Sequence, residues 1–156
     1  MKLKGFTLIE ILFSLVLLAI LSLIGIASSS YFIQKNEQQI IVDELRTVLN
    51  YAKTQAVSRG NPVSLSPLDP TKNWSHGIVL TQFNKKFNKT ETLYQWQWHH
   101  PHWVLEWSGI SSSNAIVLSN NPINAISNGH FTLSHVPTNK SILLVLNRLG
   151  RLRHKS

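Results

Sequence analysis

The stretch Lys4-Gly5-Phe6-Thr7-Leu8-Ile9-Glu10, together with the uncharged run that follows it, decides how this chain is built. Residues 11–34 read ILFSLVLLAILSLIGIASSSYFIQ and contain no Asp, Glu, Lys or Arg. At about 1.5 Å per residue, a helix over this run reaches roughly 36 Å, which exceeds the hydrocarbon core of a bilayer at about 30 Å. The run therefore predicts a single membrane-spanning helix.

The charges at the N-terminus predict the orientation of that helix. Lys2 and Lys4 precede the apolar run, and positive charge on the short leading side is typical of a cytoplasmic N-terminus. A cleaved secretory signal is the alternative, because Gly25-Ile26-Ala27 reads as a small-x-small cleavage site. Glu10 counts against that alternative, since a carboxylate inside an apolar segment is costly to insert and indicates a function.

The segment Lys4 to Glu10 resembles the prepilin peptidase recognition site of type IV pilins and type II secretion pseudopilins. The resemblance implies cleavage after Gly5, N-methylation of Phe6, and Glu10 as the fifth residue of the mature chain. In a bundle of packed helices, the Glu10 carboxylate would pair with the Phe6 ammonium of a neighbouring subunit, so that each buried charge has a partner. The expected parts are a leader at 1–5, a transmembrane and filament-core helix at 6–32, and a periplasmic head at 33–156.

Beyond the membrane segment, apolar residues recur at steps of three and four with charged residues between them, which is typical of an amphipathic helix. Gly60-Asn61-Pro62 supplies the stop, because Gly suits a helix end and Pro disfavours helix at the residue before it. The helix is therefore predicted from about Phe6 to Arg59, with residues 33–59 as its amphipathic part. The apolar positions are Ile33, Ile41, Leu45, Val48, Leu49, Ala52 and Ala56.

Residues 62–156 alternate short apolar or β-branched runs with clusters of Asn, Ser, Gly and Pro, which predicts strands. Short connections favour antiparallel pairing, and a sheet with one apolar face can pack on the helix stripe. The predicted fold class is α+β: a type IV pilin-like lollipop whose long N-terminal helix packs on an antiparallel β-sheet head. The predicted strands are Val63–Leu65, Gly77–Phe83, Thr92–Trp98, Trp103–Trp107, Ala115–Leu118, His130–Leu133 and Ile142–Asn147.

Within the pilin-like group, the head resembles the GspH/FimT family. The segments that carry the resemblance are the helix end Ala52 to Val63, the W-x-x-G strand from Trp74 to Val79, the hairpin start from Asn128 to Phe131, and the final segment from Leu146 to Arg153. Many relatives have a cysteine where Ser66 stands, whereas this chain contains no cysteine. A disulfide-braced head is therefore not expected.

The positive charge of the chain is concentrated at its C-terminal end. There are 15 Lys and Arg residues against 7 Asp and Glu, and no acidic residue follows Glu106. Arginine binds phosphate oxygens with two parallel hydrogen bonds, and Gly150 lets the backbone turn or approach a ligand closely. The predicted contacts with nucleic acid are Arg148, Gly150, Arg151, Arg153 and Lys155, with Lys140 extending the patch. A solvated basic tail is the alternative interpretation.

The pattern Gly150-Arg151-Leu152-Arg153 resembles the C-terminal tail of the FimT-type minor pilins, which bind DNA during natural transformation. On this resemblance, Arg151 and Arg153 are the main expected contacts. The loop with Lys85, Lys86 and Lys89 either adds to the patch or is an ordinary charged turn.

The segment Tyr94 to Trp103 allows two further interpretations. Its histidines, His99, His100 and His102, could bind a metal ion, and its tryptophans could stack on bases. We favour an aromatic strand face packed in the head, because Tyr94, Trp96 and Trp98 alternate with glutamines. We predict no metal and no cofactor. The acidic residues beyond the helix are too scattered to predict a catalytic pair, and no enzymatic activity is expected.

The sequence thus predicts a minor type IV pilin of the inner membrane. Its N-terminus is cytoplasmic and its head periplasmic, and the head becomes extracellular in the assembled pilus. It would bind extracellular double-stranded DNA without sequence preference and aid DNA uptake. Its other partners would be prepilin peptidase and further major or minor pilins. The alternatives are a structural GspH-like pseudopilin of a type II secretion system, a pilus-assembly subunit without DNA binding, and a membrane protein that never assembles.

Overall fold

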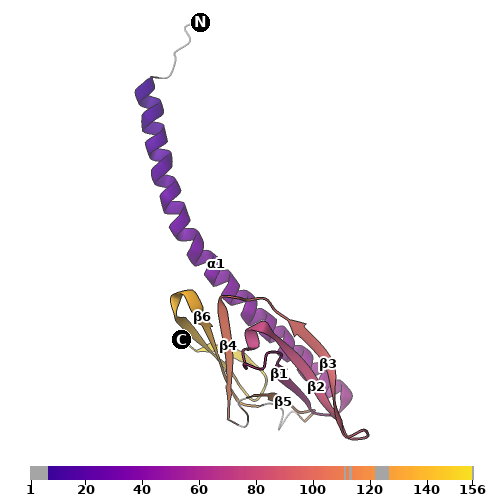
Figure 1. The fold of residues 1–156 in the computed structure, drawn as a ribbon. Coiled ribbons are helices and arrows are strands. Elements are labelled where there is room, and N and C mark those ends of the chain that lie inside the picture. The colour runs from indigo at the N-terminus through magenta and orange to yellow at the C-terminus, as the bar shows by residue number, and fades with distance from the viewer. Residues whose placement is uncertain (1–6, 111, 113, 122–126, 156) are drawn as a thin grey trace. The chain divides into compact units, whose positions relative to one another are not determined.

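A computed structural model describes residues 7–155 except 111, 113 and 122–126, and within its long helix the side chains of residues 23–30 are also outside the description. The expected leader 1–5, with the junction between Gly5 and Phe6, lies outside the described residues. The chain divides into two compact units, Met1–Val42 and Asp43–Ser156. Figure 1 shows the N-terminal helix and the strands that follow it.

Helix α1 runs over Leu8–Arg59, close to the predicted bounds. It begins with a reciprocal cap that the sequence analysis did not anticipate. The Thr7 backbone N–H donates to Glu10 Oε2 at 3.0 Å, and the Glu10 N–H donates to Thr7 Oγ1 at 3.4 Å. This is a capping box, in which a Thr and a Glu three residues later satisfy each other's free backbone donors. At the other end, Gly60 adopts a φ of +64°, a conformation that favours glycine after a helix.

The predicted transmembrane segment 6–32 includes residue 6 and the side chains of residues 23–30, which are not described. Across the residues that are described, no helical stretch is both long and apolar enough to count as a membrane span.

Among the described residues of the second unit, two antiparallel sheets of four strands each follow α1. The first sheet has the order β3-β2-β1-β5, with β1 at Val63–Pro67, β2 at Gly77–Asn84, β3 at Lys89–Gln97 and β5 at Ile116–Leu118. The second has the order β4-β6-β7-β8, with β4 at Trp103–Gly109, β6 at Gly129–His135, β7 at Lys140–Leu146 and β8 at Leu152–Lys155. Two short 3-10 helices, η1 at Trp74–His76 and η2 at Val136–Thr138, lie in the connections.

The seven predicted strands are present with shifted ends, but two features of the sheets differ from the prediction. The strands form two sheets rather than one, because β1 pairs with β2 and β5 while β6 pairs with β4 and β7. The C-terminal segment, which we had treated as a tail, is the strand β8. Its sequence, Leu-Arg-His-Lys, has a single apolar residue, so the period-2 pattern is too short to be recognised.

The predicted apolar stripe of α1 is buried from Ile41 onward. Ala52 and Ala56 are fully buried, and their small side chains permit close packing of the helix on its neighbours. Ile33 is exposed, since periodicity alone does not show where along the helix the buried part begins. The strands contribute inward residues at alternate positions, among them Leu65, Ile78, Leu80, Leu105, Ile116, Phe131, Leu133 and Leu144.

Within the second unit, α1 contacts elements of both sheets. The Tyr51 ring lies 5.5 Å from the Trp96 ring of β3, measured between centroids. On the other side, Lys53 Nζ donates to the carbonyl of Leu149 in the β7–β8 connection at 3.1 Å. The two sheets are therefore held to one helix.

A polar clip at η1 joins the β1–β2 connection to the edge of the second sheet. Asn73 Oδ1 accepts hydrogen bonds from Ser75 N at 3.0 Å and from Leu105 N at 3.0 Å, and it lies 2.8 Å from Ser75 Oγ. The buried Ser75 hydroxyl also lies 2.6 Å from the carbonyl of Trp103. Because Trp103 and Leu105 belong to β4, one asparagine and one serine satisfy two backbone groups of that edge strand, the Leu105 N–H and the Trp103 carbonyl.

We expect Asn73→Ala to destabilise the protein by roughly 1–3 kcal/mol, because the Leu105 N–H loses its acceptor in a part-buried site. The measurement is denaturant unfolding of the full chain. Asn61→Ala is the control, since the Asn61 amide makes a single exposed hydrogen bond, to the Arg59 carbonyl. Equal midpoints for Asn73→Ala and Asn61→Ala would contradict the role assigned to the clip.

The hydrogen bonds of the loop before η1 lead us to expect that the stability of the fold depends on pH. The Thr71 N–H donates to Asp69 Oδ1 at 2.8 Å, and His76 Nδ1 lies 2.6 Å from Asp69 Oδ2. These hydrogen bonds lower the pKa of Asp69 to about 2 from 3.8, with the Thr71 backbone bond the largest cause. A lowered pKa means that charged Asp69 stabilises the fold fully above pH of about 4, and that the effect is lost as pH falls toward about 2.

The advantage of wild type over Asp69→Asn in melting temperature should therefore be constant above pH of about 5 and shrink between about 4 and 2. Thermal melts of both proteins across this range measure it. A difference that stays constant down to pH of about 2 would contradict the predicted linkage.

Candidate functional site

The C-terminal basic segment begins with a tight turn between β7 and β8. Asn147 Oδ1 accepts from Leu149 N at 3.1 Å and from Arg151 N at 2.8 Å, while Gly150 N donates to the Asn147 carbonyl at 2.9 Å. Gly150 has a φ of +74°, the left-handed conformation that closes a three-residue hairpin loop. Gly150 thus serves the turn, and Asn147, which the sequence analysis did not single out, holds it.

Strand β8 divides the segment between two faces of the sheet. Leu152 and His154 pair with buried residues of β7, whereas Arg153 and Lys155 pair with half-buried ones. Directly paired side chains lie on the same face, so Leu152 and His154 lie on the inner face and Arg153 and Lys155 on the outer face. Arg153, His154 and Lys155 are exposed.

The predicted cations form a line along the sheet edge rather than a compact cluster. Arg148 and Arg151 lie in or next to the turn, and Lys155 pairs with Leu143 further along β7. Lys140 begins β7, at the end of the strand opposite the turn. Lys140 pairs with the buried His135 of β6, so it lies on the inner face. The outer-face row from Arg151 to Lys155 is roughly 14 Å long at about 3.4 Å per residue.

Little opposes this positive charge in the surrounding sequence. No acidic residue follows Glu106. Over the described part of the chain, the ion pairs join Arg46 to Asp43, His76 to Asp69 and His100 to Glu44, so none involves the C-terminal cations. The cationic side chains of the segment are therefore available to an external anion.

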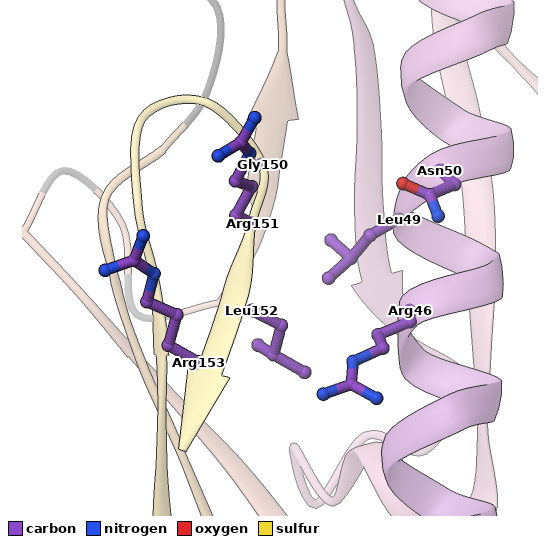
Figure 2. Close-up of a pocket in the computed structure, with 7 residues that line it drawn as sticks. All are labelled: Arg46, Leu49, Asn50, Gly150, Arg151, Leu152 and Arg153. Atoms are coloured by element: carbon purple, nitrogen blue, oxygen red, sulfur yellow. The ribbon is translucent and has the colours of Figure 1, made fainter. Parts of the chain in front are cut away.

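A groove between α1 and β8 adds residues that the sequence analysis missed. It has a volume of about 310 Å³ and is lined by Arg46, Leu49 and Asn50 of α1 and by residues 150–153. Figure 2 shows Arg46 extending from α1 toward β8 and Leu152 extending from β8 toward α1. Arg151 and Arg153 point away from α1 in the same view (Figure 2). No signal in the sequence links position 46 to the C-terminal segment, because the two meet only through the fold.

The lysine loop belongs to a different part of the unit. Lys85 and Lys86 line a polar pocket of about 300 Å³ with Arg59 at the end of α1, together with Glu91. Arg59 follows Arg46 by thirteen positions, which corresponds to roughly 20 Å along the helix. The loop therefore does not adjoin the groove at Arg46.

The histidine and tryptophan segment contacts α1 and contributes both buried and exposed aromatic side chains. His100 Nε2 lies 2.7 Å from Glu44 Oε2 on α1, and no cluster of three possible metal ligands occurs among the residues described. Trp103 is buried, whereas Tyr94 is 48% exposed and packs beside Trp96 with a centroid distance of 4.6 Å. The predicted aromatic face exists, but it lies at the rim of the unit rather than wholly inside it.

Two family profiles match the chain. The profile described as Type II transport protein GspH matches residues 42–150. The profile described as Prokaryotic N-terminal methylation motif matches residues 1–26, which contain the segment Lys4 to Glu10. No sufficiently similar relative was found among curated proteins.

Solved structures share the fold at low identity. The type IV minor pilin FimU of Pseudomonas aeruginosa strain PAO1 aligns with a TM-score of 0.60 and 18% identity, covering 80% of this chain and 92% of FimU. The minor pseudopilin EpsH from the Type 2 Secretion System of Vibrio cholerae aligns with a TM-score of 0.57 and 9% identity, covering 77% of this chain and 97% of EpsH. These alignments confirm the predicted α+β fold, with its N-terminal helix and antiparallel sheets.

Pilins and pseudopilins are structural proteins without enzymatic activity that assemble with other pilins or pseudopilins. Folds of this type are anchored in the membrane by the N-terminal helix and carry a periplasmic head. The match over residues 42–150 covers most of the chain, and the methylation motif precedes it. The chain therefore belongs to the GspH family, has a pilin-like fold, and carries the prokaryotic N-terminal methylation motif.

Proposed function

We propose that this protein is a minor pilin that binds extracellular double-stranded DNA through its C-terminal hairpin and so aids DNA uptake in natural transformation. The main contacts in this proposal are Arg151 and Arg153. Arg148, Lys155 and Lys140 add charge along the edge, and Gly150 closes the turn that presents the arginines.

One observation carries the proposal: an exposed edge strand and its turn hold cations that make no ion pair over the described residues. Arginine and lysine side chains in this state can neutralise phosphates and release the counterions condensed on DNA. The roughly 14 Å row of charge from Arg151 to Lys155 corresponds to about four base pairs of B-DNA at about 3.4 Å each. The unit thus offers a short phosphate-binding strip on the outer face of its C-terminal hairpin.

The composition of the strip favours binding without sequence preference. Contacts to phosphate position a protein on DNA but do not read its bases. Binding of this kind is weak for each subunit and strongly dependent on salt, and several subunits in one filament would raise the avidity. Both properties suit the capture of DNA of arbitrary sequence.

A structural role is the second candidate, and the match to the GspH family favours it. In that role the protein is a minor pseudopilin of a type II secretion system or a pilus-assembly subunit, and it has no DNA ligand. The basic edge would then serve solubility and discourage edge-to-edge pairing of strands.

The N-terminal steps belong to the same proposal. Prepilin peptidase cleaves between Gly5 and Phe6, Phe6 is methylated, and Glu10 pairs with the Phe6 ammonium of a neighbouring pilin. Before assembly the chain crosses the inner membrane once, with its N-terminus in the cytoplasm. After assembly the head is extracellular. The match of the methylation motif to residues 1–26 supports these steps.

The test is a titration of labelled duplex DNA with the full chain in neutral detergent. We expect Arg151→Ala/Arg153→Ala to weaken binding roughly tenfold or more at about 0.1 M salt, because two phosphate contacts are lost. The slope of log K against log salt should become shallower by about 1.8, or about 0.9 for each contact.

Lys85→Ala/Lys86→Ala is the matched control, since it removes the same charge from the other end of the unit. An equal loss in both double variants would point to net charge rather than to the hairpin. Wild-type binding by Arg151→Ala/Arg153→Ala would remove the hairpin from the proposal, and no binding by any of the proteins would favour the structural role.

A further inference from the structure

The face of α1 beside the β7–β8 hairpin carries its own polar stripe. Arg46, Asn50 and Lys53 follow one another at steps of four and three, which places them on one side of the helix. Lys53 is tied to the hairpin through the Leu149 carbonyl, and Arg46 and Asn50 line the groove with residues 150–153. Arg46 and Asn50 of this stripe form the polar part of the groove wall on α1.

Cations therefore flank the β8 edge on both sides. Arg151 and Arg153 point away from α1, while Arg46 extends from α1 toward β8 (Figure 2). Between them, the floor of the groove contains the apolar side chains of Leu49 and Leu152. A sugar-phosphate backbone combines a charged phosphate with a less polar sugar, which suits a groove with an arginine on its wall and leucines at its floor.

Arg46 already has an acidic partner, Asp43. Among the salt bridges of the described residues, this is the one that involves a residue lining the groove. Arg46 Nη1 lies 2.8 Å from Asp43 Oδ1, and both side chains are about half exposed, at 48% and 56%. An exposed ion pair of this kind contributes little to stability. A phosphate can therefore replace the carboxylate at Arg46 at small cost.

We propose that the groove between α1 and β8 is part of the DNA site. Arg46 binds a phosphate of the DNA backbone, and the Asp43 carboxylate competes with that phosphate for Arg46. This inference rests on the proposed DNA-binding function. It extends the DNA-binding site from the C-terminal hairpin to helix α1. It also implies that Asp43 lowers the affinity of the protein for DNA.

Two variants with opposite expected effects test the inference, again with labelled duplex and the full chain in neutral detergent. Arg46→Gln should weaken binding roughly fivefold at about 0.1 M salt and make the salt slope shallower by about 0.9. Asp43→Asn should strengthen binding roughly two- to threefold, because a negative charge near the phosphate is removed. A role of the Arg46–Asp43 pair in folding alone would not produce tighter binding.

The controls change net charge by the same amount elsewhere. Lys72→Gln, in the loop before η1, matches the loss of one positive charge in Arg46→Gln. Glu91→Gln matches the loss of one negative charge in Asp43→Asn, and its amide oxygen can still accept from Asn84 Nδ2. Melting temperatures of all variants show whether each protein is folded.

The outcomes separate this inference from the function on which it rests. If Arg151→Ala/Arg153→Ala loses affinity while Arg46→Gln and Asp43→Asn bind as their controls do, the hairpin binds DNA and the groove has no part in it. If Asp43→Asn weakens binding while it remains folded, the competition is wrong. If wild type does not bind DNA, the proposed function fails together with the inference.

Discussion

The architecture of the second unit depends on burial of the apolar stripe of α1. Residues Leu45 to Ala56 present leucine, valine and alanine side chains that are almost wholly removed from water. Burial of this much apolar surface is the dominant favourable contribution to folding, and it requires partners on both sides of the helix. Contacts at Tyr51 toward β3 and at Lys53 toward the β7–β8 turn show that the two sheets supply them. The sheets do not pair with each other through strand ladders, so the helix and the clip at Asn73 hold them in one unit.

The same packing determines where the C-terminal charges lie. Because β8 is the last strand of its sheet, its cations Arg153 and Lys155 lie on an open edge. An open edge exposes unpaired backbone groups, and charged side chains there discourage pairing with another chain. The edge charges therefore have a structural use whether or not DNA is the ligand. In the proposed function the same positive charges have two effects. They repel the like-charged edge of another chain, and they attract the phosphates of DNA.

Glu10 shows how one side chain can have an intramolecular and an intermolecular partner. Within the chain it completes the capping box with Thr7, which satisfies donors at the start of α1. In the proposed filament it also faces the Phe6 ammonium of a neighbour. A carboxylate has two oxygens and about four acceptor positions, so a cap and an ion pair are compatible in principle. The cost of placing a charge in an apolar segment is then offset by two sets of partners rather than one.

Local patterns in the sequence were sufficient for the elements that depend on neighbouring residues. The period of Leu45 to Ala56 predicted the buried helix face, and Gly60 to Pro62 predicted its end, because periodicity and backbone preference act over one or two turns. The division of the strands into two sheets was not predictable in this way, since pairing of β1 with β5 joins segments about fifty residues apart. Strand β8 was missed because three of its four residues are polar.

The candidate site divides along the same line. The sequence by itself determined that the chain has a basic C-terminus with a glycine turn and arginines at alternate positions, because these are properties of consecutive residues. Only the tertiary structure decided that Arg153 and Lys155 lie on the outer face of an edge strand, that Lys140 lies on the opposite face at the far end of β7, and that Arg46, with its partner Asp43, lies across a groove from β8. The physical reason is that register and helix packing bring together residues about a hundred positions apart, and no short-range pattern encodes that distance.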